Sequence, residues 1–120
     1  MKKEYEKAVE TYKDCLALPK EESNPLMLAG IHQMLGNAMR KTSERKEAPQ
    51  VFEQGWQWLE KLDEEMLKTN AMTMFYAKDM LEVADSTMYA NYIEKFEGWW
   101  GRNWQRQLKT GQLQAIENLN

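Results

Sequence analysis

The sequence predicts an all-α protein with five or six helices that pair as antiparallel hairpins, in a repeat-like or an irregular bundle. Three observations predict this fold class. Apolar residues recur at steps of three and four along most of the chain, which places them on one face of a helix. No stretch alternates apolar and polar residues for long, and no Asn-Gly or Asp-Gly pair marks a hairpin turn. The links between the periodic segments are short, which favours antiparallel neighbours.

The composition narrows the class of protein further. The chain has 120 residues, of which 42% are apolar, and a net charge of −3. A chain of this length suits one globular domain, so we expect a single α-helical domain over residues 1–120. Three prolines, six glycines and one cysteine exclude collagen-like, disordered and disulfide-scaffold proteins. Nine methionines and five tryptophans, both high for this length, accompany a single histidine.

The first helix is expected over residues 3–18, where Pro19 stops it because proline has no backbone N–H to donate. Cys15 lies on the apolar side of this helix, so we expect a buried and unreactive thiol. The apolar stripe contains Tyr5, Ala8, Val9, Tyr12, Cys15 and Leu16.

The second helix is expected over residues 25–41. Asn24 offers a side-chain oxygen to the first amides and Pro25 takes the first helical position, which together form a strong start signal. The face expected to be buried contains Leu28, Ile31, Leu35, Ala38 and Met39, with Met27 and Met34 at its margins.

The third helix is expected to be the longest. Thr42 and Ser43 cap it, Pro49 is tolerated only in its first turn, and it reaches as far as Lys68. Its apolar face contains Phe52, Gly55, Trp56, Leu59, Leu62 and Met66.

Three further helices are expected after the third. Asn70 caps a helix over residues 71–84, and Asp85 opens another that runs to Trp100. Gly98 and Gly101 weaken this helix by about 1 kcal/mol each relative to alanine, so a kink or an end is expected there. A last short helix uses Trp104, Leu108 and, after Gly111, Leu113 and Ile116.

The second and third helices carry the spacing of a known helical repeat. The residues with this spacing are His32, Leu35, Gly36, Met39, Ala48, Phe52 and Gly55. The stretch from Ala29 to Leu62 resembles one repeat of the tetratricopeptide family, in which a large residue precedes Leu-Gly and an aromatic residue, and Ala and Phe follow four apart. The small residues would let the paired helices approach closely. His32 stands where the family has Trp, and Met39 where it has an aromatic residue.

The resemblance extends in part to the first helix, where residues 5–19 are similar to the second half of a repeat. It implies a helical scaffold that holds a segment of a partner in a concave groove without chemistry of its own. About three repeats are needed for a stable array, so the resemblance also implies that a partner or a second copy, as a homodimer, completes the fold.

The residues that usually build active sites are scarce. His32 is the only imidazole and Cys15 the only thiol, so no His-based zinc site and no Cys–His nucleophile with a second orienting His can be assembled. Asp79, Glu82 and Asp85 share one helical face, but no Glu-x-x-His pair accompanies them, which favours a solvated acidic face over a metal site. We therefore expect no enzyme, no cofactor and no metal.

Residues 98–109 hold three tryptophans and three basic residues. Trp100, Trp104 and Leu108 recur at four-residue steps, which is typical of a stripe that faces the core. Trp and Arg are also the commonest anchors of protein interfaces. Bases stacked on Trp and phosphates bound by Arg or Lys would instead make a nucleic-acid site, and a helix lying on a membrane surface is a fourth interpretation.

The favoured hypothesis is a non-enzymatic protein-interaction module, namely an adaptor, chaperone or inhibitor that binds another protein through an apolar helical surface. The alternative is a nucleic-acid-binding protein that uses the Trp/Arg-rich C-terminal third. The unpaired cysteine and the lack of an apolar run of about 18 residues favour a cytoplasmic protein outside the membrane. The residues expected to contact the partner are Trp99, Trp100, Arg102, Trp104 and Arg106, with His32 and Met39 second if the second and third helices line a concave face.

Overall fold

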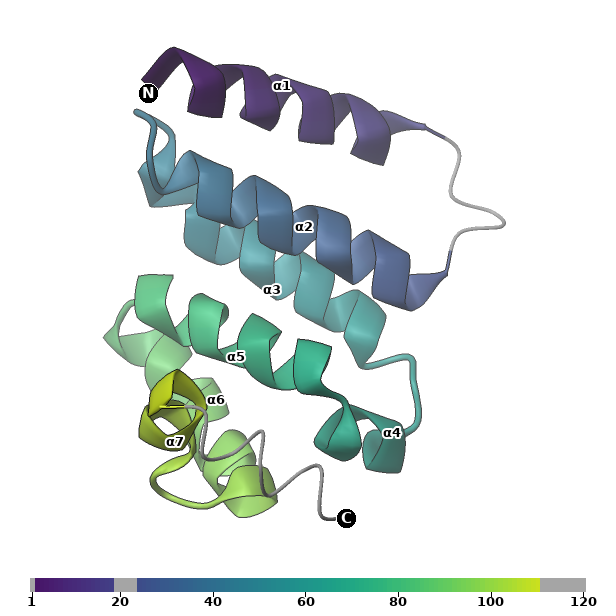
Figure 1. Cartoon of the computed structure of the whole chain (residues 1–120), viewed down its shortest axis with the longest axis vertical. Helices are drawn as coiled ribbons and strands as arrows, with labels where there is room; N and C mark the ends of the chain where they lie inside the picture. The colour runs from purple at the N-terminus through teal and green to yellow at the C-terminus, as the bar shows by residue number, and fades with distance from the viewer. Residues whose placement is uncertain (1, 19–23, 111–120) are drawn as a thin grey trace. The chain divides into compact units, whose positions relative to one another are not determined.

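The all-α fold class is confirmed by a computed structural model, which describes residues 2–18 and 24–110. These residues form seven α-helices and one 3₁₀ helix, and no strand occurs among them (Figure 1). The chain divides into two compact units, Met1–Leu62 and Asp63–Asn120. The single domain over residues 1–120 stays a prediction. None of the helices in the described part of the chain is both long enough and apolar enough to cross a membrane.

The first unit contains α1 (Lys2–Ala17), α2 (Pro25–Met39), the 3₁₀ helix η1 (Arg45–Glu47) and α3 (Ala48–Leu59). The α-helices run in alternating directions, and α2 contacts both α1 and α3 (Figure 1). The start of α2 is as predicted, because Asn24 Oδ1 accepts a hydrogen bond of 2.8 Å from the Leu26 amide. Antiparallel neighbours are therefore confirmed for this unit.

A close approach of backbone and ring joins α2 to α3. Gly36 is buried, and a Cβ built on it would lie only 2.7 Å from Cδ2 of Phe52 and 2.9 Å from Cζ. Phe52 itself is fully buried. Only glycine leaves room for this ring, so the expectation that small residues at this position let the two helices approach closely is confirmed.

The second helix ends two residues earlier than predicted, at Met39. The buried Thr42 hydroxyl donates to the Met39 carbonyl at 3.0 Å and accepts from the Glu44 amide at 3.1 Å. The hydroxyl thereby satisfies a carbonyl of the last turn and redirects the chain toward η1. Within the predicted buried face, Ile31 is half-buried rather than buried.

The prediction of one long third helix reaching Lys68 is wrong. The segment is divided into η1, α3 and the short helix α4 (Glu64–Thr69), and the longest helix is α1 with 16 residues. Pro49 lies in the first turn of α3, where its missing N–H costs nothing, as expected. Asp63 then adopts an extended conformation and starts a new helix.

The first helix buries less than its apolar stripe predicts. Val9 is 2% exposed, whereas Cys15 is exposed, which contradicts the expected buried thiol. The physical reason is that α1 has its main contact with one neighbour, α2, and a single neighbouring helix covers only a narrow stripe.

The second unit contains α4, α5 (Ala71–Val83), α6 (Ser86–Trp100) and α7 (Trp104–Thr110), with α5 in contact with the other three. Asn70 and Asp85 cap α5 and α6 through hydrogen bonds of 2.8 Å to backbone amides. Gly101, with φ of 92°, ends α6 as predicted. The expected continuation of the last helix at Leu113 and Ile116 lies outside the described residues.

Candidate functional site

A groove between α1 and α2 is the candidate site, and we call it the α1–α2 groove. Its volume is about 490 Å³. The α1 residues in it are spaced three and four apart, and so are most of those from α2, because such residues share one face of each helix. The groove is lined by Tyr5, Ala8, Tyr12, Met34, Asn37, Ala38, Arg40 and Lys41.

Two alanines lie among the larger side chains that line the groove. Ala8 of α1 and Ala38 of α2 fill little space between the two helices, which leaves a hollow. Tyr5 and Met34 remain exposed beside it, with 39% and 46% of their surfaces accessible. Met27 is also exposed on α2, two turns earlier, but does not line the groove.

The groove ends at a basic turn that follows α2. A second hollow of about 490 Å³ lies there, and it shares Arg40 and Lys41 with the groove. Arg40 Nη1 donates a hydrogen bond of 3.1 Å to Asn37 Oδ1, which fixes the guanidinium against α2. The residues that line this second hollow, called the basic turn below, are Arg40, Lys41, Thr42, Ser43, Arg45 and Lys46.

One ion pair joins α1 to the chain beside the basic turn. Lys13 Nζ lies 2.7 Å from Glu44 Oε1. The hydrogen bond that Lys13 donates to Glu44 raises the pKa of Lys13 above its usual value of 10.5, although burial acts in the opposite direction. Glu44 is the only acidic residue between Arg40 and Lys46, so its pairing with Lys13 leaves the field of the turn positive.

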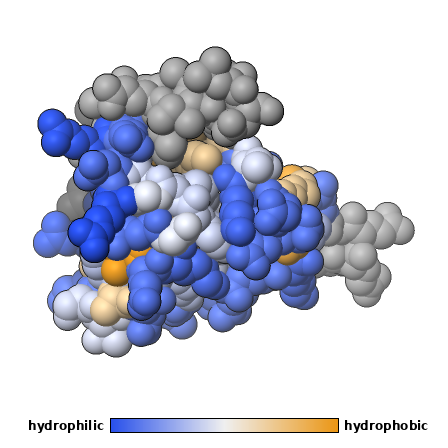
Figure 2. Space-filling view, turned by 90° about the horizontal axis from the view of Figure 1, so that it is seen from below, coloured by the Kyte–Doolittle hydropathy of each residue, from blue (hydrophilic) through white to orange (hydrophobic). Residues whose placement is uncertain are grey.

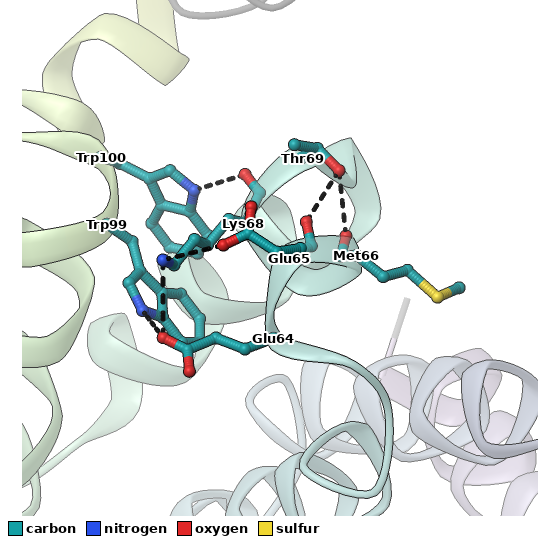
Figure 3. A network of polar contacts seen from close by, with 7 residues as sticks. All are labelled: Glu64, Glu65, Met66, Lys68, Thr69, Trp99 and Trp100. Carbon is teal, nitrogen blue, oxygen red and sulfur yellow. Dashed lines mark hydrogen bonds and ion pairs between the residues drawn. The ribbon is translucent and has the colours of Figure 1, made fainter.

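The predicted tryptophan cluster lies largely against its own unit. Trp99 Nε1 donates to Glu64 Oε1 at 3.0 Å, and Trp100 Nε1 donates to the Lys68 carbonyl at 2.8 Å (Figure 3). Both rings are half-buried. The hydrogen bonds hold the C-terminal end of α6 against α4, so these two indoles stabilise the packing of the second unit.

Trp104 is fully buried, and its ring lies edge-on to Phe96 with 5.7 Å between the centroids. Phe96 is also stacked on Trp100, with centroids 5.5 Å apart. Leu108 is buried as well, which confirms the core-facing interpretation for Trp104 and Leu108. By contrast, the side chains of Arg102 and Arg106 are exposed.

The two secondary candidates also lie inside the protein. His32 is 5% exposed, and its Nδ1 lies 2.8 Å from the Leu28 carbonyl oxygen, a hydrogen bond that requires the proton on Nδ1. Met39 is 1% exposed. Neither side chain presents a surface in this conformation, because the face of α2 that carries them is covered.

Sequence periodicity places five of the groove residues on apolar helix stripes, namely Tyr5, Ala8, Tyr12, Met34 and Ala38, and it does not mark Asn37 or Arg40. The sequence feature that indicates this part of the chain is a group of four cations within residues 40–46, in a chain whose net charge is −3. Two of these cations, Arg40 and Lys41, line the groove. Within residues 2–18 and 24–110, no group of three or more His, Cys, Asp or Glu side chains could hold a metal ion. Comparison of the chain with protein-family models, curated proteins and solved structures gave no match.

Proposed function

We propose that this chain is a non-enzymatic helical module that binds another protein, as an adaptor, chaperone or inhibitor, through the α1–α2 groove. The observation that carries the proposal is the exposure of large apolar side chains, Tyr5 and Met34, beside a hollow of about 490 Å³. Exposed apolar surface that lines a concave site, rather than lying singly on a convex surface, favours a binding role.

The side chains around the groove suit a protein partner. Tyrosine can bury a large ring while its hydroxyl stays in contact with water, and the flexible thioether of methionine adapts to partners of different shape. Covering a half-exposed Met34 would contribute about 1 kcal/mol to binding. By contrast, the face shown in Figure 2 is mostly hydrophilic, with small separate hydrophobic patches.

The non-enzymatic part of the proposal is supported by the chemistry of the groove. Its lining, as far as the structure describes it, consists of tyrosine, alanine, methionine, asparagine, arginine and lysine, without a carboxylate or an imidazole. General acid–base catalysis uses histidine most often and also carboxylates, lysine and tyrosine, and of these groups only lysine and tyrosine line the groove.

The nucleic-acid alternative has less support. Base stacking on the C-terminal tryptophans would need exposed ring faces, whereas Trp104 is buried and the indoles of Trp99 and Trp100 are hydrogen-bonded to α4 residues. Arg102 and Arg106 are accessible to phosphates, but two cations neutralise few of them.

The experiment compares two exposed methionines of the same helix. The wild-type chain, Met34→Asp and the matched control Met27→Asp are immobilised, and the proteins that each retains from an extract of the source cells are quantified. We expect wild type and Met27→Asp to retain the same proteins and Met34→Asp to lose them. Equal retention by all three chains would contradict binding through the groove.

Two further measurements test the other possible ligands, which are a second copy of the chain and a nucleic acid. Light scattering gives the mass of the free chain, and a mass twice 14.2 kDa that Met34→Asp returns to 14.2 kDa would identify a second copy as the partner. A gel shift at low salt that Arg102→Glu with Arg106→Glu abolishes would favour the nucleic-acid alternative instead.

A further inference from the structure

We infer that the partner segment is an acidic amphipathic helix whose apolar side chains enter the α1–α2 groove and whose carboxylates lie over the basic turn. This inference rests on the proposed function, since it names the chemistry of the segment that the groove would take.

The apolar and the basic parts form one surface. Arg40 and Lys41 line both the groove and the second hollow, so no other residue separates the two. A ligand that covers Met34 therefore passes directly onto cations at the end of α2. This continuity favours a ligand with apolar and anionic groups on one side.

The charge of the basic turn contrasts with that of the chain. Four cations lie within residues 40–46, while the whole chain has a net charge of −3. The single acid among them, Glu44, lies 2.7 Å from Lys13, and Lys41, Arg45 and Lys46 are exposed. Charge complementarity therefore favours a partner with carboxylates, and it disfavours basic segments by repulsion.

The spacing of the two parts fits a helical partner. Met34 and Lys41 are seven residues apart on α2 and the turn that follows, or about 10 Å at the helical rise of 1.5 Å per residue. A partner helix covers this length in two turns, which places its apolar residues at i and i+3 or i+4 and its carboxylates about seven residues away. Grooves between two helices commonly take an amphipathic helix in this manner.

A simple anion would use only half of the surface. Phosphate or a nucleic-acid backbone would pair with the cations of the basic turn but would leave Met34 and Tyr5 uncovered. The exposed apolar side chains beside the cations therefore favour a protein segment over a polyanion.

The inference is tested by selection from a displayed library of random peptides of about 16 residues, long enough for some four helical turns. Peptides are selected on the wild-type chain and counter-selected on Met34→Asp, whose side chain is exposed, so that the fold tolerates the change. We expect the enriched peptides to carry apolar residues at helical spacing and a net negative charge. Enrichment of neutral or basic peptides would overturn the inference.

One enriched peptide then serves as a fluorescent probe for binding by anisotropy. We expect Lys41→Glu with Lys46→Glu to weaken its binding about tenfold or more, and added salt to weaken binding to the wild type. The matched control, Arg102→Glu with Arg106→Glu, makes the same charge change elsewhere and should leave the affinity unchanged. Helical content from circular dichroism confirms that each variant folds.

The outcomes separate the inference from the proposed function. If peptides bind and depend on Met34 but not on the basic turn, the acidic partner is wrong and the groove still binds protein. If no peptide prefers the wild type over Met34→Asp, both proposals fail. If single-stranded DNA binds the basic turn more tightly than any enriched peptide does, the surface is a polyanion site and the inference is overturned.

Discussion

Replacement of Gly36 by alanine tests the contact that joins α2 to α3. The added Cβ would lie 2.7 Å from Cδ2 and 2.9 Å from Cζ of Phe52, whereas ordinary contact begins at 3.4 Å. The ring would have to move by at least about 0.7 Å, and it is fully buried. The perturbation is therefore overpacking of a rigid core.

Two opposing effects decide the size of the change. Overpacking costs about 1–3 kcal/mol, and the close approach of several Phe52 ring atoms places this case near the upper end. Alanine in a helix interior is favoured over glycine by about 1 kcal/mol. We therefore expect Gly36→Ala to lower the free energy of unfolding by about 2 kcal/mol.

Urea unfolding followed by far-ultraviolet circular dichroism measures this loss. Gly98→Ala is the matched control, because Gly98 also lies within a helix but nothing stands within 4 Å of its added Cβ. The control should gain up to about 1 kcal/mol. Combining Gly36→Ala with Phe52→Leu should restore part of the loss. If Gly36→Ala stabilises the chain as the control does, the steric reasoning is refuted.

Three further changes test the helix start, the indole contact and the buried phenol. Asn24→Ala removes the acceptor of the Leu26 amide and should lower the stability by about 1 kcal/mol in the same urea assay. Trp100→Phe keeps a ring but leaves the Lys68 carbonyl without its 2.8 Å donor, so we expect a loss of about 1 kcal/mol, and an unchanged unfolding midpoint would contradict this contact. Burial raises the pKa of Tyr76 far above 10.0, so above about pH 10 only the unfolded chain releases the proton, and the free energy of unfolding should fall by about 1.4 kcal/mol per pH unit. Urea unfolding at increasing pH should show a shallower fall for Tyr76→Phe.

Most of the helical architecture could be predicted because local residues determine where helices begin. Asn24 followed by proline, Asn70 and Asp85 each provide an acceptor for a first-turn amide, and each starts a helix in the structure. The close contact at Gly36 was also predictable, since a small residue facing a large ring follows from the spacing within two helices.

The failures concern positions where packing overrides local pattern. The break between α3 and α4 contains neither glycine nor proline, so periodicity continues through it to Lys68. Cys15 lies on an apolar stripe, yet α1 is covered mainly by one neighbour and its thiol stays exposed. Helical spacing shows which residues share a face but not how much of that face another helix covers.

The candidate site could not be predicted for a related reason. Tyr5 and Met34 are 29 residues apart, and only the pairing of α1 with α2 brings their side chains to one groove. The composition of the tryptophan-rich stretch, residues 98–109, indicates a binding surface, whereas the four-residue spacing of Trp100, Trp104 and Leu108 indicates a face turned to the core. In the structure, the ring of Trp104 packs on Phe96, and the indole N–H groups of Trp99 and Trp100 donate hydrogen bonds to α4. All of these contacts lie within the second unit.

Mapping of a bound peptide by two-dimensional NMR of the backbone amides tests the central claim most directly. An enriched acidic peptide is titrated into the labelled chain, and the shift of each amide signal is followed. We expect the largest changes at Tyr12, Met34, Ala38 and Lys41, which line the groove. Changes confined to residues 99–106, with the groove signals unmoved, would contradict binding through the α1–α2 groove.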